Sequence, residues 1–147
     1  MNYRDLLPVA IALAVEAHGG TIGKDGMPYI LHPLRLMMKA DGYAEQIVAV
    51  LHDAVEDTAL TLQELADRGF PEEIVSAIEA VTKKPGEDYE AFIERIAADP
   101  LAARVKLLDL YDNVDLTRLA EVGETDLQRV AKYHRTIARL ERPPLPQ

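Results

Sequence analysis

Apolar residues recur every three or four positions along nearly the whole chain, and no stretch alternates as a half-buried strand would. Clusters of glycine and proline divide this helical pattern into segments. The pattern predicts helices from the N-terminus to Gly19, then over about 32–41, 44–57, 61–69, 71–81, 88–97, 99–119 and 125–140.

Two of these segments carry additional signals. The segment 44–57 contains the run IVAVLHDAV, which is apolar on most sides and therefore predicts a central, buried helix. Thr61 is followed three residues later by Glu64, which is the pattern of a capping box and predicts a helix start.

The chain is expected to form one all-α domain over residues 1–140, a single helical bundle of about seven to nine helices. The sequence contains no internal repeat, low-complexity tract or linker that would divide it. Residues 141–147, ERPPLPQ, cannot continue a helix and are predicted to form a short flexible tail. A chain of 147 residues can bury a core without disulfides, and this one contains no cysteine.

Composition limits the partners. A net charge of −9 argues against a nucleic-acid polymer, because binding to a phosphate backbone relies on clustered lysine and arginine. A small phosphorylated ligand is still compatible, since a bound metal and a few basic side chains can dominate the local field. No segment has the roughly 18 uninterrupted apolar residues of a membrane span. The sequence predicts a cytoplasmic protein without membrane association, and it leaves a homo-oligomer open because no sustained heptad pattern decides the matter.

The most informative chemistry lies in four side chains of metal-binding type: His32, the adjacent pair His52-Asp53, and Asp109. Two imidazoles and two carboxylates suit a divalent ion of intermediate hardness such as Mn²⁺, although other divalent metals accept the same donors. Four protein ligands leave an octahedral ion two further positions, for a substrate and an activated water. The set therefore predicts a metal-dependent hydrolase.

Two of these ligands also have simpler interpretations. A histidine followed by proline, as in His32-Pro33, can merely cap or pack at a helix start. Asp109 lies among leucines, where a carboxylate is more often a ligand or a paired group than a surface charge. Lys106, one turn earlier, could be its partner in a plain salt bridge, and Asn113 follows one turn later on the same face.

A second polar group lies beside the His52-Asp53 pair. At about 100° per residue, Glu56 lies nearly in line with His52, and Asp57 lies one turn beyond Asp53. Ionisable groups on the flank of a buried helix cost free energy unless they bind a cation or one another. The alternative is that Glu56 and Asp57 simply form the solvated end of the helix.

The pattern of a histidine, a later His-Asp pair and a distant aspartate resembles the HD-domain phosphohydrolase superfamily. The segments AHGGTIGKDGMPYILHPLRL, LHDAVEDT and VKLLDLYDN resemble, in the same order, the hydrolase domain of RelA/SpoT-type guanosine tetraphosphate enzymes. The free-standing forms of that domain are small alarmone hydrolases. The resemblance implies manganese-dependent removal of the 3′-pyrophosphate of guanosine tetra- or pentaphosphate (ppGpp or pppGpp), giving GDP or GTP and pyrophosphate.

The resemblance also implies roles for individual residues. The positions that bind manganese match His32, His52, Asp53 and Asp109. The positions that flank the attacking water, and so act in catalysis, match Glu56 and Asp57. The positions that contact the substrate match Lys24, Tyr29 and Asn113, although Tyr29 could equally be a core aromatic beneath its loop.

Four positions depart from the family pattern. Gly23 stands where the family usually has an arginine before Lys24. Family members commonly read DRLHNM from the metal-binding aspartate, whereas this chain reads DLYDNV, so that Leu110 replaces arginine and Asp112 replaces histidine. Asp115 stands where a basic residue is common. The pocket is therefore expected to be less cationic.

Two alternatives to an alarmone hydrolase follow from these departures. The first is an HD-domain phosphohydrolase that acts on another nucleotide or phosphorylated metabolite. The second is a non-catalytic helical module that binds a metal or a nucleotide.

Overall fold

The computed structural model describes residues 2–142, and nine helices account for most of this range. They are α1 (Tyr3–His18), α2 (Leu31–Lys39), α3 (Tyr43–Leu51), α4 (Ala54–Asp57), α5 (Leu62–Asp67), α6 (Glu72–Val81), α7 (Tyr89–Ala97), α8 (Pro100–Asn113) and α9 (Glu124–Glu141). Because no strand is present among these residues, the prediction of an all-α bundle of about seven to nine helices is confirmed.

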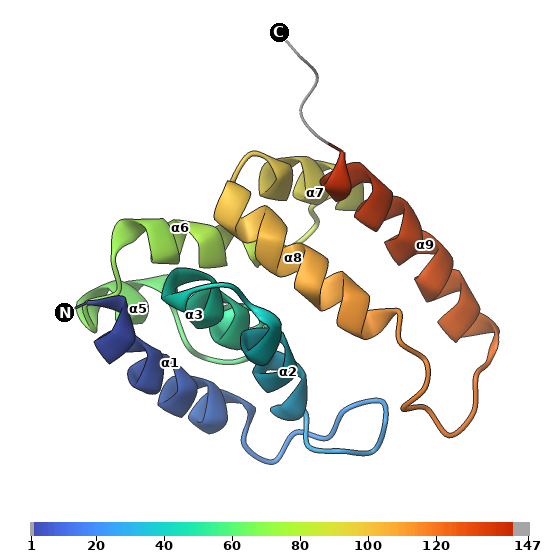
Figure 1. Ribbon diagram of the computed structural model, residues 1–147, viewed down its shortest axis with the longest axis horizontal. Helices are drawn as coiled ribbons and strands as arrows, with labels where there is room; N and C mark the ends of the chain where they lie inside the picture. Colours follow the sequence, from blue (N-terminus) through green and yellow to red (C-terminus); the bar gives the residue numbers. More distant parts are fainter. Residues whose placement is uncertain (1, 143–147) are drawn as a thin grey trace, which may run out of the picture.

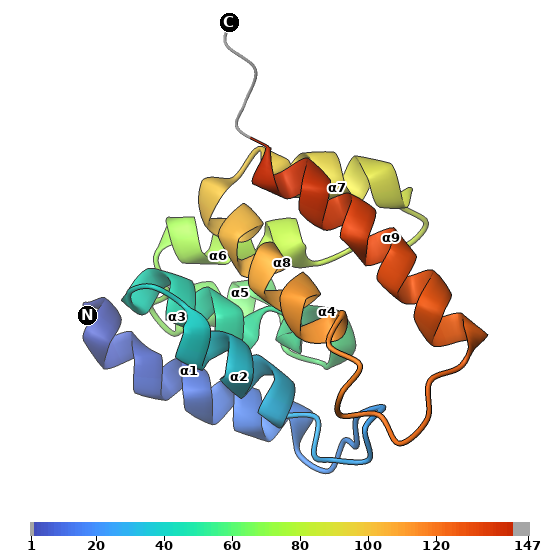
Figure 2. The same cartoon turned by 45° about the vertical axis from the view of Figure 1, so that its right-hand side comes forward.

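The central helix is α3, which packs against α1, α2, α6 and α8 (Figure 1). Its residues from Ile47 to Leu51 are fully buried, as the apolar run predicts. Burying each large aliphatic side chain of this kind contributes about 1.5–3 kcal/mol. On the other side of the bundle, α9 packs along α8 after the loop 114–123 (Figures 1 and 2). A continuous core thus holds α2, α3 and α8 in fixed relative positions.

The prediction of one continuous helix over 44–57 was wrong. α3 ends at Leu51, and a turn at His52-Asp53 separates it from the short α4. The Nδ1 atom of His52 lies 2.7 Å from the carbonyl oxygen of Ala49, which in a continuous helix would pair with the backbone N–H of Asp53. Asp53 has φ −103° and ψ −5°, away from the helical minimum. The imidazole thus competes with the helical hydrogen bonds at the point where the chain turns.

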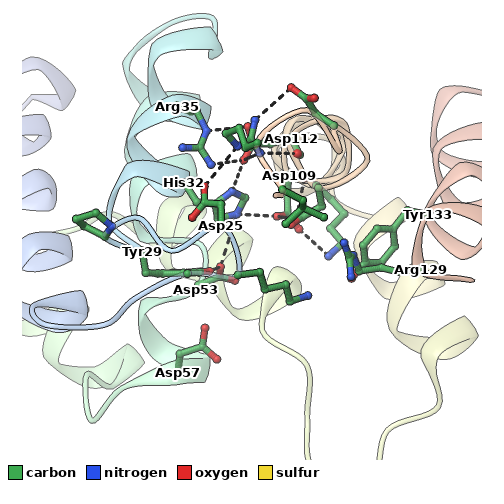
Figure 3. A pocket seen from close by; sticks show the side chains of 18 of the residues that line it. Asp25, Tyr29, His32, Arg35, Asp53, Asp57, Asp109, Asp112, Arg129 and Tyr133 are labelled. Atoms are coloured by element: carbon green, nitrogen blue, oxygen red, sulfur yellow. Dashed lines mark hydrogen bonds and ion pairs between the residues drawn. The ribbon is translucent and has the colours of Figure 1, made fainter. Parts of the chain in front are cut away.

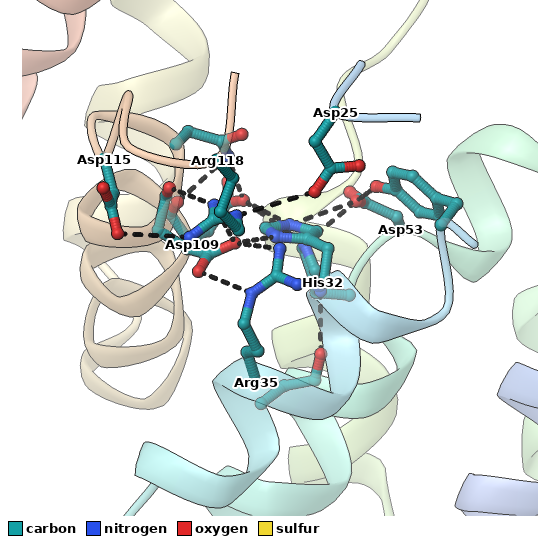
Figure 4. A network of polar contacts seen from close by, with 12 residues as sticks. Asp25, His32, Arg35, Asp53, Asp109, Asp115 and Arg118 are labelled. Carbon is teal, nitrogen blue, oxygen red and sulfur yellow. Dashed lines mark hydrogen bonds and ion pairs between the residues drawn. The ribbon is translucent and has the colours of Figure 1, made fainter. Parts of the chain in front are cut away.

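The prediction of a helix over 99–119 was also wrong, because α8 ends at Asn113. The side chain of Asp115 accepts a hydrogen bond from the backbone N–H of Thr117 at 3.0 Å and from its hydroxyl at 2.6 Å. Such local bonds offer the backbone an alternative to the helix. The loop 114–123 is the result, and it carries Arg118 to the network of charges beside α8 (Figure 4).

Other predicted boundaries agree closely with the structure. Thr61 and Glu64 form both hydrogen bonds of a capping box at the start of α5. The last helix reaches Glu141, and residues 143–147 of the predicted tail lie outside the described residues. None of the helices within 2–142 has both the length and the apolar character of a membrane span.

Candidate metal centre

The fold brings the four predicted metal-binding side chains together from three segments of the chain, and Figure 3 shows His32, Asp53 and Asp109 of this set. His32 lies at the start of α2, His52 and Asp53 form the turn after α3, and Asp109 projects from α8. The Nε2 atom of His32 lies 3.0 Å from Oδ1 of Asp109 and 3.9 Å from Oδ2 of Asp53. The Nε2 atom of His52 lies 3.0 Å from the same oxygen of Asp53 and 3.5 Å from Oδ1 of Asp109. Two imidazole nitrogens therefore face the same two carboxylate oxygens.

His52 has the hydrogen-bond pattern of a metal ligand. Its Nδ1 atom lies within hydrogen-bond distance of the Ala49 carbonyl, so that a neutral ring carries its proton there and leaves the Nε2 lone pair free. That Nε2 atom is buried and, although Oδ2 of Asp53 lies 3.0 Å away, it forms no well-aligned hydrogen bond. A buried polar atom without a hydrogen bond costs about 1–3 kcal/mol, which a bound cation would offset. The residues present thus fit a divalent metal, both by donor type and by this unsatisfied nitrogen.

Asp109 uses its two carboxylate oxygens for different contacts. Oδ1 faces the histidines and accepts a hydrogen bond from Nδ2 of Asn113 at 2.7 Å. Oδ2 accepts a hydrogen bond from Nζ of Lys106 at 2.9 Å. The sequence offered a salt bridge with Lys106 as an alternative to metal binding. This salt bridge is present, but it uses only Oδ2, so Oδ1 of Asp109 still faces the two histidines.

The cluster of carboxylates attracts positive charge. Burial alone would lower the pKa of His52, but Asp53 and Asp109 outweigh it and raise that pKa well above its ordinary value. Burial also opposes protonation of His32, yet its hydrogen bonds to Asp109 and Asp112 raise its pKa. Burial would raise the pKa of Asp109, but Lys106 and the two histidines hold it well below its usual range. The surrounding carboxylates thus favour positive charge on the two histidines.

Glu56 and Asp57 lie on α4, beside the cluster and exposed to solvent. Their carboxylate oxygens lie within 4.8 Å of one another and of an oxygen of Asp53. Glu56 accepts a hydrogen bond from the backbone N–H of Lys83 at 2.7 Å, which fixes its position. Burial together with the charges of Asp53 and Glu56 raises the pKa of Asp57 to about 6. A carboxyl group with such a pKa can exchange a proton with a reacting water near neutral pH.

The side chains of His32, His52, Asp53 and Asp109, called the metal-type cluster below, lie between two cavities. The larger, of about 350 Å³, is lined by Asp53, Asp109 and His32, and the smaller, of about 230 Å³, by the same two aspartates and His52. Asp57 lies on the wall of the larger cavity, as Figure 3 shows. A phosphorylated ligand in the larger cavity would thus reach both the metal-type donors and the carboxylates of α4.

The three predicted substrate contacts all line the larger cavity, in different environments. Lys24 is exposed in the loop after α1. Tyr29 is half-buried, and its hydroxyl donates a hydrogen bond to Oδ2 of Asp53, so it supports a predicted ligand. Asn113 is bound to both the side chain and the backbone carbonyl of Asp109.

Several cavity residues were missed by the sequence analysis. Arg129 and Tyr133 of α9 face the cluster from the opposite side of the cavity (Figure 3). Their spacing of four residues on one helix face was a weak signal. Arg35 lies one turn after His32, and Arg118 comes from the loop after α8. No local pattern distinguishes these arginines from ordinary surface residues.

The structure also places the residues that depart from the family pattern. Leu110 is fully buried in the protein and does not line either cavity. Asp112 is buried as well, and it forms ion pairs with Arg35 and Arg118. Asp115 and Gly23 lie on the wall of the larger cavity.

Comparison with known proteins gives a consistent result. No family model matches the chain. The chain is 37% identical over 117 residues to guanosine-3′,5′-bis(diphosphate) 3′-pyrophosphohydrolase of Aquifex aeolicus, covering 71% of this chain and 17% of that protein. It is 30% identical over 137 residues to the bifunctional (p)ppGpp synthase/hydrolase SpoT of Escherichia coli, covering 84% of this chain and 19% of that protein. The chain thus spans less than a fifth of the length of these relatives.

A solved structure shares the fold. It belongs to a metazoan orthologue of SpoT described as hydrolysing ppGpp, and it superimposes with a TM-score of 0.76 at 19% sequence identity. The match covers 91% of this chain and 84% of the other. Together, the sequence relatives and the shared helical fold identify the chain as an HD-domain protein of the RelA/SpoT type.

Proposed function

We propose that this chain is a metal-dependent phosphohydrolase that removes the 3′-pyrophosphate of ppGpp or pppGpp. The observation that carries the proposal is the convergence of four metal-type donor atoms beside a cavity whose wall also holds the carboxylates of Glu56 and Asp57. The names of the relatives in Aquifex aeolicus and Escherichia coli support the choice of reaction.

The proposed metal is Mn²⁺, held by His32, His52, Asp53 and Asp109. When bound, a divalent ion of this kind lowers the pKa of a coordinated water and polarises a phosphoryl oxygen. The protein supplies the orientation of the donors. Tyr29 holds Asp53 through its hydroxyl, and the ammonium group of Lys106 keeps Asp109 ionised.

The carboxylates of α4 are proposed to handle the water. Asp57, whose pKa lies near 6, accepts a proton from the water. At the same time the water oxygen forms a bond to the phosphorus of the 3′-pyrophosphate that is attached to the ribose. The bond between that phosphorus and the ribose 3′-oxygen breaks, and the oxygen takes up a proton to leave GDP or GTP. Glu56, fixed by the backbone N–H of Lys83, orients the water.

Basic and aromatic groups on the cavity wall are proposed to bind the nucleotide. Lys24 and Arg129 both line the cavity and carry positive charge, although Arg129 also pairs with Asp126 at 2.9 Å, and charge-assisted contacts to phosphate are stronger than neutral ones. Tyr133 offers an aromatic surface from α9, and Asn113 adds an amide beside Asp109.

The test is a product assay. Purified protein is incubated with Mn²⁺ and a panel of nucleotides that includes ppGpp, and the products are resolved by anion-exchange chromatography. Conversion of ppGpp to GDP and pyrophosphate is the expected outcome. Metal binding without any product from the whole panel would reject catalysis and favour a non-catalytic nucleotide- or metal-binding module.

One observation favours a second candidate, a phosphohydrolase for a nucleotide or metabolite with fewer negative charges. Two of the cavity arginines, Arg35 and Arg118, are paired with the buried carboxylate of Asp112 and so offer less charge to a ligand. The same panel decides between the two candidates. Faster cleavage of a less charged phosphate ester than of ppGpp, at equal concentration, would favour the second.

A further inference from the structure

Both ring nitrogens of His32 face a carboxylate of α8. Nε2 lies 3.0 Å from Oδ1 of Asp109, at the proposed metal position, and Nδ1 lies 2.7 Å from Oδ2 of Asp112 on the opposite edge of the ring. The two aspartates are three residues apart, so they project from the same face of the helix. Asp112 is only 3% exposed, and its contact with His32 is shielded from water.

Asp112 is itself held in one orientation. Nε and Nη2 of Arg35 donate to the two carboxylate oxygens of Asp112, each at 2.9 Å. This bidentate arrangement fixes the plane of a carboxylate. Arg118, which Figure 4 labels, lies 3.3 Å from Oδ2 of Asp112 and donates to the backbone carbonyl of Asp112 at 2.9 Å. These two arginines balance the buried negative charge, and neither forms a hydrogen bond or an ion pair with His32.

We propose that Asp112 is a positioning residue for His32, accepting the Nδ1 proton so that the Nε2 lone pair faces Asp53 and Asp109. The inference rests on the proposed metal site, since its purpose is to present a ligand there. A carboxylate that accepts the second ring proton of a metal-binding histidine fixes the tautomer and raises the basicity of the ligand. The substitution of aspartate for the histidine of DRLHNM is therefore a gain in ligand support rather than merely the loss of a cation.

A purely structural role makes a different prediction. If Asp112 served only to anchor Arg35 and Arg118, its removal would lower stability and leave both the tautomer of His32 and the metal affinity unchanged. The tautomer and the affinity are therefore the informative measurements, and activity is not needed.

The affinity for Mn²⁺ is measured by titration calorimetry of the full chain and of Asp112→Ala. Removal of a partner of this kind typically costs 10- to 100-fold in metal affinity, so a rise in Kd of about 10- to 100-fold is expected. Glu94→Ala is the matched control, because Glu94 forms a similar bidentate pair with Arg139 on the surface. Its Kd should stay within about twofold of that of the parent chain, since exposed pairs contribute little.

The tautomer is measured in metal-free protein by long-range ¹H–¹⁵N NMR, at a pH high enough to leave His32 neutral. The parent chain should carry the proton on Nδ1, and Asp112→Ala should shift His32 toward a mixture of tautomers. Asp112→Asn retains an acceptor oxygen and covers the case in which the alanine variant fails to fold. It should keep the Nδ1 tautomer.

Two results would overturn the inference: an Asp112→Ala protein whose Kd is unchanged, or a parent chain whose neutral His32 carries its proton on Nε2. A parent chain that binds no Mn²⁺ would instead reject the proposed metal site. In that case the tautomer measurement still decides whether Asp112 positions the ring.

Discussion

Two clusters of charged side chains differ in whether their hydrogen bonds are complete. Arg95 of α7 donates to both carboxylate oxygens of Glu87 and to the backbone carbonyls of Glu79, Ala80 and Thr82. These five bonds match the five N–H donors of a guanidinium. The carbonyls lie at the end of α6, where a helix leaves its last acceptors without partners inside the helix.

The metal-type cluster also combines carboxylates with basic side chains, here two imidazoles, but its hydrogen bonds are incomplete. His52 has a buried Nε2 atom without a hydrogen bond, and carboxylates from Asp53 and Asp109 converge on the same position. The comparison teaches that burial of charge does not by itself mark a functional site. Complete pairing stabilises the fold, whereas a buried nitrogen without a hydrogen bond, beside converging carboxylates, indicates a position that fits a cation.

The largest expected effect is on catalysis. His52→Ala removes the Nε2 atom that is proposed to bind the metal. The change should lower turnover by at least about a thousandfold, because metal catalysis supplies several kcal/mol of transition-state stabilisation. Turnover is measured with the best substrate of the panel, and the helical fold is checked by circular dichroism. His134→Ala, at an exposed position of α9, is the matched control and should retain full activity. Full activity in a metal-stripped His52→Ala protein would contradict the proposal.

The next effect concerns stability in the presence of metal. A ligand that binds only the folded state adds about 2.7 kcal/mol at a concentration of 100 Kd, so Mn²⁺ should raise the melting temperature of the parent chain. The shift should disappear in Asp53→Ala and persist in Arg95→Ala. Equal shifts in both variants would mean that the metal binds elsewhere.

Removing the hydrogen bonds of Arg95 should change the stability of the fold and nothing else. Arg95→Ala removes the side-chain donors from the partly buried carbonyls of Ala80 and Thr82 at the end of α6 and should cost about 1–3 kcal/mol, measured by urea denaturation. Metal affinity per folded molecule should not change. Arg139→Ala, which removes an exposed pair with Glu94, is the control and should cost less than about 1 kcal/mol. A loss of metal affinity in Arg95→Ala would show that the two clusters are coupled.

The smallest effect is the pH dependence of the metal-free protein. Since the folded pKa values of His32 and His52 lie above 6.5, their contribution to stability is full below pH 6.5 and is lost as pH rises through the folded values. The melting temperature of the metal-free chain should therefore fall as pH rises above about 6.5. Metal binding should weaken in the opposite direction, as pH falls and protons compete for the same nitrogens. A melting temperature that rises with pH in this range would contradict the assignment.

The sequence by itself predicted most of the helices and the residues that are proposed as metal donors. The apolar run that includes Ile47 to Leu51 predicted the central, buried helix, and the capping box at Thr61 predicted the start of α5 to the residue. Both signals are local, because they depend on side chains within one or two turns of each other. The sequence also predicted the metal-type donors, because the His-Asp pair and the segments around it resemble those of a known family in the identity of their residues.

Only the tertiary structure decided how the ends of these helices and the site around them are arranged. The turn at His52 and the end of α8 at Asn113 depend on side chains that compete with backbone hydrogen bonds, which apolar periodicity does not record. The contact between His32 and Asp112 joins residues 80 positions apart, and Arg129 enters the cavity from the last helix. Spacing along the chain predicts which face of a helix a residue occupies. Which faces meet is set by packing of the whole bundle, and so the partners of His32 became visible only in the folded protein.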